Sequence, residues 1–310
     1  MTGLRFTGAT LDRAAELRSD RAEMDRLLAD PRARFVGASA DHVVVSSHEP
    51  DGGVHLLRRP LNGQVNPYQP ILLGLEQDGR PLFAADVSEP EAGALLEATG
   101  TGRLLLLRDA GMLLSQAEGG LAAYLVGLLN WHRTHMFCSR CGSGTKVAEA
   151  GLSRRCPRCK ASHFPRTDPV VIMLVSDGDR VLLGRRLGWE PGRFSILAGF
   201  ISSGETPEEA VLREVLEEAG IEAHAPSYIA SQPWPFPSSL MLGFEASADG
   251  GEPVPQVGEM ADVRWFTFEE IRAAQQRPGQ LGDGTLRLPG EVSIARSLID
   301  AWVARGGRRL

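Results

Sequence analysis

Residues 199–221 read Gly199-Phe-Ile-Ser-Ser-Gly-Glu205-Thr-Pro-Glu-Glu-Ala-Val-Leu-Arg213-Glu214-Val-Leu-Glu217-Glu218-Ala-Gly220-Ile221. Thr206 suits a helix N-cap, Pro207 suits the first helical position, and Glu209 completes a capping box. Gly220 suits the position just after a helix, where a left-handed backbone is common. The stretch therefore predicts a helix over residues 206–219 that is bounded at both ends by its own residues.

The two faces of this predicted helix differ in chemistry. One face gathers the apolar side chains, which are Val211, Leu212, Val215, Leu216 and Ala219. Glu214, Glu217 and Glu218 fall together on the other face, and Arg213 relieves only part of their mutual repulsion. Such a cluster is either a solvated face or a site for hard divalent cations such as Mg²⁺ or Mn²⁺, which take oxygen ligands and commonly bridge to substrate phosphates. Spacing alone favours the solvated face.

The whole stretch resembles the Nudix box, G-x5-E-x7-R-E-U-x-E-E-x-G-U, where U is a bulky aliphatic residue. Every fixed position is filled, by Gly199, Glu205, Arg213, Glu214, Glu217, Glu218 and Gly220, with Val215 and Ile221 as U. The resemblance implies an α/β/α sandwich that hydrolyses a nucleoside diphosphate linked to another moiety. It also implies Mg²⁺ or Mn²⁺ in the active site, with more than one ion per site.

The same resemblance implies roles for individual residues. By it, Glu214, Glu217 and Glu218 bind the cations, Arg213 orients a neighbouring glutamate, and Glu205 completes the catalytic group. Glu259, in a later acidic stretch, resembles the additional glutamate that completes the metal cage, and the backbone carbonyl of Ala198 is a further candidate ligand. Glu218 is the expected base that activates the attacking water.

Four cysteines form the second strong pattern. They are Cys138, Cys141, Cys156 and Cys159, the only cysteines of the chain, spaced C-x2-C-x14-C-x2-C. Each pair can present two thiolates from one tight knuckle, and two knuckles make a closed tetrahedral site that suits a structural zinc. The alternative is two disulfides, which a chain without a visible export signal disfavours. We therefore expect one structural Zn²⁺ per chain.

A third informative stretch reads Ser231-Gln-Pro-Trp-Pro-Phe-Pro-Ser-Ser239-Leu-Met241. Its alternating prolines predict a stiff, extended loop that holds Trp234 and Phe236 as an aromatic platform for a flat base. The alternative is a proline-rich hydrophobic loop packed on the core, and the residues alone leave the two alternatives even.

This stretch resembles the S-Q-P-W-P-F-P-x-S motif of the NADH pyrophosphatase subfamily of Nudix hydrolases. The resemblance implies a homodimer in which Phe200 stacks on the nicotinamide and Trp234 is contributed across the dimer. Phe164 lies where relatives often have tyrosine. The implied substrate-binding residues are Phe164, Phe200, Gln232, Pro233, Trp234, Pro235, Phe236, Pro237, Ser238, Ser239 and Ala295.

Composition sets the broad class. The chain has 310 residues, 33 Lys and Arg against 39 Asp and Glu, and a net charge of −6. These values indicate a globular protein of about two domains and argue against a protein that coats nucleic acid. No apolar run approaches the roughly 20 residues of a membrane helix, and no signal peptide is visible, so we expect a cytoplasmic protein with no membrane partner.

Three segments are expected. They are an N-terminal α/β structural domain at residues 1–132, the zinc ribbon at 133–167 and a Nudix domain at 168–310. Predicted strands lie at 43–45, 54–57, 71–75, 104–107, 170–175, 180–184, 227–231, 240–246 and 262–267, and further helices at 91–98, 121–131 and 291–304. The ribbon is locally basic, either as a contact surface for RNA or polyphosphate or as a solvated face, and the acidic remainder of the chain favours the second.

These observations predict a metal-dependent hydrolase that cleaves the pyrophosphate of NADH or NAD⁺ into the nicotinamide mononucleotide and AMP. One alternative keeps this chemistry but acts on the NAD cap at the 5′ end of RNA. Another is a nucleotide-binding regulator with no turnover, which the intact glutamate set disfavours because a binder has no need of a full metal cage.

Overall fold

The computed structural model describes residues 3–46, 53–61, 70–87, 91, 93–94, 102–276 and 284–308. The chain divides into two compact units. The C-terminal unit is built from residues 168–233 and 239–310 with the first four residues of the chain, and the N-terminal unit is built from residues 5–167 together with 234–238. Among the described helices, none combines the length and apolar character needed to cross a membrane.

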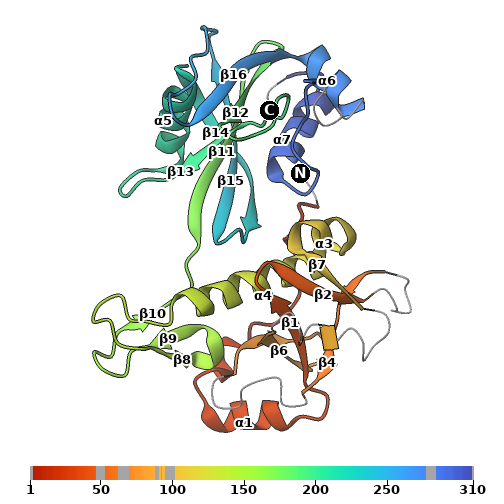
Figure 1. Cartoon of the computed structure of the whole chain (residues 1–310), viewed down its shortest axis with the longest axis vertical. Coiled ribbons are helices and arrows are strands. Elements are labelled where there is room, and N and C mark those ends of the chain that lie inside the picture. The colour runs from red at the N-terminus through yellow and green to blue at the C-terminus, as the bar shows by residue number, and fades with distance from the viewer. Residues whose placement is uncertain are drawn as a thin grey trace. The chain divides into compact units, whose positions relative to one another are not determined.

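A six-stranded mixed sheet forms the centre of the C-terminal unit, in the order β14-β15-β11-β12-β16, with β13 paired to β11 (Figure 1). The strands are β11 (Asp168–Asp177), β12 (Arg180–Arg186), β13 (Leu197–Phe200), β14 (Ala223–Trp234), β15 (Ser239–Ala248) and β16 (Met260–Thr267). Strand β11 runs parallel to β15 and antiparallel to β12 and β13. The five strands predicted for this half of the chain are confirmed, and β13 is an additional one.

Helices cover both faces of this sheet (Figure 1). They are α5 (Pro207–Ala219), α6 (Phe268–Gln276) and α7 (Ile294–Ala304). Val171 and Met173 of β11 belong to the cluster that also contains the buried residues of α5. Ile172 and Leu174 belong to the opposite cluster, with the buried residues of α6 and α7. Because successive strand residues point to opposite faces, the continuous apolar run of β11 fills two cores and produces the expected α/β/α sandwich.

The N-terminal unit contains a second mixed sheet, in the order β3-β2-β1-β6-β5, with β4 paired to β1 and β7 paired to β2. Its strands are β1 (Arg34–Ser39), β2 (His42–Ser46), β3 (His55–Leu56), β4 (Arg59–Pro60), β5 (Leu72–Leu75), β6 (Pro81–Asp86) and β7 (Gly102–Leu106). Strand β1 is parallel to β6, and the other pairings are antiparallel.

Helices α1 (Arg21–Ala29) and α4 (Gln116–Thr134) lie on opposite faces of this sheet, and α3 (Leu107–Leu113) precedes α4 (Figure 1). The strands predicted at 43–45 and 71–75 and the helix at 121–131 are confirmed, and of the strand predicted at 54–57 only residues 55–56 form a strand, β3. The strand predicted at 104–107 is β7, but it spans residues 102–106, so the prediction starts two residues late and includes Leu107, which begins α3. Of the helix predicted at 91–98, residues 92 and 95–98 lie outside the described residues.

The ribbon is a three-stranded antiparallel sheet of β8 (Lys146–Ala148), β9 (Ser153–Arg155) and β10 (Ser162–His163). Arg154 of this ribbon is buried rather than part of a basic surface, because its guanidinium donates to Thr145 and to Nδ1 of His132 on α4. Arg18, also buried, donates to the carbonyls of Leu72, Leu73 and Ala150. These two arginines tie the ribbon to the rest of the N-terminal unit.

Candidate active site

Helix α5 begins and ends as its sequence predicts. The Thr206 hydroxyl accepts from the Glu209 amide, and the Glu209 carboxylate accepts from the Thr206 amide, which forms a complete capping box. Gly220 adopts φ 65° at the C-cap. The two caps fix where α5 begins and ends, and so fix the backbone positions from which its glutamate side chains project.

The two faces of α5 are not divided as expected. Leu216 is 51% exposed, whereas Glu218 is only 1% exposed. The expectation that Leu216 shares the core face with Val211 and Val215 is therefore wrong, because the helix is turned so that its core stripe runs through Ala210, Val211, Val215 and Ala219. The same rotation carries the side chain of Glu218 out of solvent. The solvated-face interpretation consequently fails for this glutamate.

Arg213 organises the first part of the site. Its guanidinium donates to both oxygens of Glu205, at 2.7 and 2.8 Å, and to the carbonyl of Phe200 at 2.9 Å. Its Nη1 atom donates to Glu214 at 2.7 Å and to Glu217 at 3.0 Å. The hydrogen bonds from Arg213 hold the pKa of Glu205 at about 2, so this carboxylate stays charged.

The glycine at position 199 is required by the packing of Glu214. A Cβ atom on Gly199 would lie 1.8 Å from Cδ of Glu214, which no side chain can tolerate. Gly199 belongs to β13, whose pairing with β11 places the carbonyl of Ala198 in the same region. The box glycine therefore makes room for a carboxylate.

Glu218 is the most perturbed carboxylate of the site. Burial raises the pKa of Glu218 to about 7, and the neighbouring Arg186 opposes that rise. Its Oε1 atom accepts from Arg186 at 3.0 Å, while its Oε2 atom is buried and has no hydrogen-bond partner. Arg186 also donates to the Ala198 carbonyl at 2.9 Å and lies 3.2 Å from Glu259. The arginine thus contacts three of the five groups expected to serve as ligands.

This donor set fits a hard divalent cation. Carboxylate and carbonyl oxygens are the ligands that Mg²⁺ and Mn²⁺ prefer, and the Oε2 atom of Glu218, which has no hydrogen-bond partner, can accept a cation. Glu214, Glu217, Glu218 and Glu259 would hold the cation together with the Ala198 carbonyl. Sequence reasoning missed Arg186, because the strand predicted at 180–184 stops two residues before it.

The cysteines form the second candidate metal site. The four thiols lie within 4.8 Å of one another, and within the described residues they are the one such group of three or more ligand side chains. Cys138 lies 3.5 Å from Cys159, and Cys141 lies 3.5 Å from Cys156, close to the spacing of about 3.8 Å that tetrahedral Zn–S bonds require. A hydrogen bond from the Ser143 backbone lowers the pKa of Cys141 to about 6, which favours the thiolate. The site fits a closed structural zinc.

The proline-rich stretch at residues 231–241 consists of two strand ends joined by a turn, and is not extended throughout. Residues 235–238 form the turn between β14 and β15, and they belong with Trp234 to the N-terminal unit. There the Trp234 ring lies 5.0 Å from Phe236 and 6.0 Å from Phe6 between centroids, and Arg108 stands 5.2 Å above it. The prediction of an extended conformation is correct for residues 231–234 and 239–241, which lie in β14 and β15. It is wrong for residues 235–238, because these four residues reverse the chain between the paired strands.

The other expected substrate-binding residues fall into two groups. Phe200 and Phe164 are exposed, at 61% and 63%, and are available to a ligand. Gln232 is fully buried, its amide bonding the carbonyl of Val292 and the amide of Ile294, and Ala295 is 3% exposed in the core. In this structure the last two position the start of α7, and their substrate contacts stay predictions.

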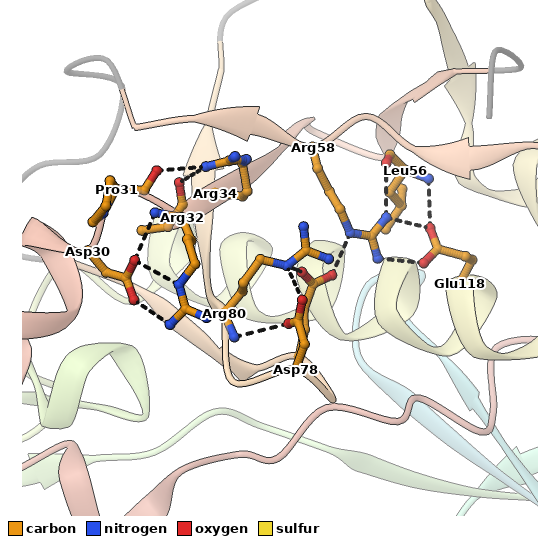
Figure 2. A network of polar contacts seen from close by, with 11 residues as sticks. Asp30, Pro31, Arg32, Arg34, Leu56, Arg58, Asp78, Arg80 and Glu118 are labelled. Atoms are coloured by element: carbon orange, nitrogen blue, oxygen red, sulfur yellow. Dashed lines mark hydrogen bonds and ion pairs between the residues drawn. The ribbon is translucent and has the colours of Figure 1, made fainter. Parts of the chain in front are cut away.

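A charged cavity of about 330 Å³ lies in the N-terminal unit. Figure 2 shows the polar contacts among several of the side chains that line it. The arginines and carboxylates that line this cavity form ion pairs with one another. Arg58 donates to both oxygens of Glu118 and to Glu76, and Arg80 forms ion pairs with Glu76 and Asp78. Because each of these charges already forms an ion pair, we interpret the network as a structural link among β4, β5 and α4.

Three family models match the chain in succession. The NADH pyrophosphatase-like rudimentary NUDIX domain matches residues 27–131, the NADH pyrophosphatase zinc ribbon domain matches 133–164, and the NUDIX domain matches 165–283. The second and third matches correspond to the cysteine site and to the carboxylate site on α5.

Curated relatives agree with these matches. The NAD-capped RNA hydrolase NudC of Mycobacterium bovis is 40% identical over 243 residues, covering 77% of this chain and 76% of the relative. The protein of the same name from Stutzerimonas stutzeri is 43% identical over 185 residues, covering 60% and 62%. The mitochondrial NAD(P)H pyrophosphatase NUDT13 of Mus musculus is 38% identical over 249 residues, covering 75% and 71%. The chain therefore belongs to the Nudix hydrolases, in the NADH pyrophosphatase group that carries a zinc ribbon.

Proposed function

We propose that this enzyme hydrolyses the pyrophosphate bond of NADH or NAD⁺ to nicotinamide mononucleotide and AMP. The observation that carries the proposal is the intact carboxylate set of α5 in a chain whose ribbon and N-terminal segment both match NADH pyrophosphatase models. Relatives named for NAD-capped RNA and for NAD(P)H support the same substrate class.

In the proposed reaction a water oxygen attacks one phosphorus, the bridging P–O bond breaks, and the bridging oxygen leaves with the other nucleotide. Divalent cations, when bound, neutralise charge on the phosphate oxygens and lower the pKa of the water. Glu218 takes the water proton, a role supported by its pKa of about 7. Arg213 keeps Glu214 and Glu217 in place through its bonds to Glu205.

Product analysis tests this proposal. Purified protein is incubated with NADH, NAD⁺, ADP-ribose or NAD-capped RNA in Mg²⁺ or Mn²⁺, and products are separated by chromatography. We expect AMP and the nicotinamide mononucleotide from NADH and NAD⁺. Absence of turnover on all four substrates would overturn the proposal.

Removal of the NAD cap from RNA is a second candidate activity by the same chemistry. Six basic residues of the ribbon region remain exposed and are available to phosphates: Arg140, Lys146, Arg155, Arg158, Lys160 and Arg166. If they contact the RNA body, activity on capped RNA falls steeply with salt while activity on NADH does not. Equal salt dependence for the two substrates contradicts this role of the ribbon.

The proposal includes a cytoplasmic homodimer that uses Mg²⁺ or Mn²⁺. The S-Q-P-W-P-F-P-x-S stretch supports the dimer, because in the resembling subfamily its tryptophan acts across the subunit interface. Sedimentation at micromolar concentration measures the assembly, and a monomer at all concentrations contradicts it. Activity titrations with each ion identify the preferred cation.

A further inference from the structure

Arg186 occupies the centre of the candidate cation site. A single nitrogen, Nη2, lies 2.9 Å from the Ala198 carbonyl, 3.0 Å from Oε1 of Glu218 and 3.2 Å from Oε1 of Glu259. These are three of the oxygens that the Nudix resemblance assigns to the cation. The Arg186 guanidinium therefore lies at the point that these three oxygens share.

The arginine and a bound cation are in competition for this position. A cation held by the same oxygens lies about 2.1 Å from each of them. The oxygens all lie 2.9–3.2 Å from Nη2, so a cation bound to the same oxygens would come close to that nitrogen, and the two positive charges would repel. Within the described residues, no three of the site carboxylates bring oxygens within 4.8 Å of one another, which only the four cysteines do with their thiols.

The surroundings favour an exchange rather than a permanent pair. The Glu218 side chain is almost completely buried, so its charged form is stabilised by a positive partner. The side chain of Arg186 is 43% exposed, so its guanidinium can return to water at low cost. Oε2 of Glu218 stays unsatisfied beside the arginine, so the guanidinium pairs this carboxylate incompletely.

We propose that Arg186 is the resident counter-ion of Glu218, Glu259 and the Ala198 carbonyl, and that a divalent cation takes its place when it binds. This inference rests on the metal-dependent part of the proposed function, but not on the identity of the nucleotide. If the exchange occurs, competition from Arg186 determines how tightly the enzyme binds the divalent cation. Without metal, the arginine keeps the buried carboxylate neutralised.

Mn²⁺ binding to the full-length zinc-loaded protein, without nucleotide, tests the exchange. Free Mn²⁺ is measured by electron paramagnetic resonance for the wild type, Arg186→Ala and Arg185→Ala. Arg185 is the matched control, because it precedes Arg186 on β12 but donates to the carbonyl of Trp189. We expect Arg186→Ala to bind Mn²⁺ roughly tenfold more tightly, since a charge-assisted contact no longer competes. We expect Arg185→Ala to remain within about twofold of the wild type.

Chemical rescue separates displacement from simple charge repulsion. Guanidinium chloride at non-denaturing concentration should weaken Mn²⁺ binding in Arg186→Ala toward the wild-type value, because the free guanidinium ion refills the vacated position. An equal concentration of NaCl should not restore the wild-type affinity. Each salt should change the Mn²⁺ affinity of the wild type and of Arg185→Ala by the same amount.

Two results overturn the inference. One is unchanged or weaker Mn²⁺ binding in Arg186→Ala, and the other is an equal gain in Arg185→Ala, which would reflect net charge alone. Because no nucleotide is present, failure of NADH turnover refutes the proposed function without touching this result. Zinc content and melting temperature confirm that each variant is folded.

Discussion

Two helices of the protein each carry a buried glutamate beside an arginine, and the two sites differ in what remains unpaired. On α4, both oxygens of Glu118 accept from Arg58, and one also accepts from the Leu56 amide (Figure 2). On α5, one oxygen of Glu218 accepts from Arg186 and the other has no partner. Burial of a glutamate beside an arginine therefore does not mark a functional site. A buried oxygen without a hydrogen bond is not sufficient either, because Oε2 of Glu76 in the network around Glu118 also lacks one and lies 3.4 Å from Arg80. The excess of negative charge around Glu218 is what separates the two sites.

The charge around each glutamate supports the same distinction. Near Glu218, five carboxylates (Glu205, Glu214, Glu217, Glu218 and Glu259) face two arginines, which leaves an excess of three negative charges. Near Glu118, three carboxylates face two arginines, and one of the three, Asp78, is largely in water. The first cluster needs additional cations, whereas the second is close to balanced.

The largest effect expected from this comparison is loss of turnover in Glu218→Gln. Removing a carboxylate that holds the cation should lower kcat by orders of magnitude. Stability should hold or rise slightly, because burial already raises the pKa of Glu218 to about 7 and an amide needs no counter-ion. Steady-state NADH hydrolysis and calorimetry measure the two quantities. Activity within about tenfold of the wild type, or 1.4 kcal/mol, would contradict the metal-binding role.

Glu118→Gln is the matched variant and should give the opposite result. Loss of a buried ion pair should lower the unfolding free energy of the N-terminal unit by about 3 kcal/mol, while turnover per folded molecule stays near the wild type. If Glu118→Gln abolishes turnover without a change in melting temperature, the comparison between the two helices breaks down.

Removal of the zinc should also act on stability rather than chemistry. We expect one zinc per chain by elemental analysis, and we expect Cys156→Ser to destabilise or precipitate the protein by loss of several kcal/mol of metal-linked folding energy. The buried contacts of Arg18 and Arg154 would carry that loss from the ribbon into the N-terminal unit. Freshly purified protein without zinc, or a Cys156→Ser variant of unchanged stability, contradicts this expectation.

A pH-dependent loss of stability should arise at His132 in the N-terminal unit. Arg154 can only donate, so Nδ1 of His132 accepts and its Nε2–H donates to the Gly151 carbonyl. Burial lowers the pKa of His132 to about 4. Between pH 6.5 and 4, His132 is protonated in the unfolded chain but not in the folded chain. The free energy of unfolding therefore falls as pH falls, by about 3 kcal/mol over this range.

Chemical unfolding at pH 7 and pH 5.5 measures this contribution. His132→Gln should lose about 1.4 kcal/mol less than the wild type over that interval, because its side chain does not titrate. Identical pH dependence in the two proteins would contradict the assignment of a neutral, buried His132.

Sequence predicted well where local chemistry decides the structure. The capping box and Gly220 fix α5 at both ends, and the cysteine spacing fixes the ribbon, so both could be read without knowledge of distant contacts. The β11 strand was equally clear, because its β-branched run can only be buried on both faces. These features need no information beyond a few neighbouring residues.

The remaining features depend on contacts between distant segments. The burial of Glu218 follows from how α5 is rotated on the sheet, which helical spacing alone predicted wrongly because it placed Leu216 rather than Glu218 toward the interior. The role of Arg186 depends on a residue 32 positions away. Strands β1 and β6 are short and pair in parallel across a long connection, so their sequences carry weak signals that only the completed sheet resolves.

The smallest effect concerns Trp234, whose ring packs on Phe236 and Phe6 in the N-terminal unit. If this ring also stacks on nicotinamide, Trp234→Ala should lower kcat/KM for NADH by ten- to a hundredfold, from about 1–3 kcal/mol of stacking. ADP-ribose lacks that ring, so its hydrolysis should change much less. Phe6→Leu is the control, because it loosens the packing under Trp234 but keeps the indole. The contrary outcome is an equal loss of kcat/KM for NADH and ADP-ribose in Trp234→Ala, the same loss in Phe6→Leu, and an unchanged assembly by sedimentation. That outcome would mean that Trp234 supports the turn and does not bind the base.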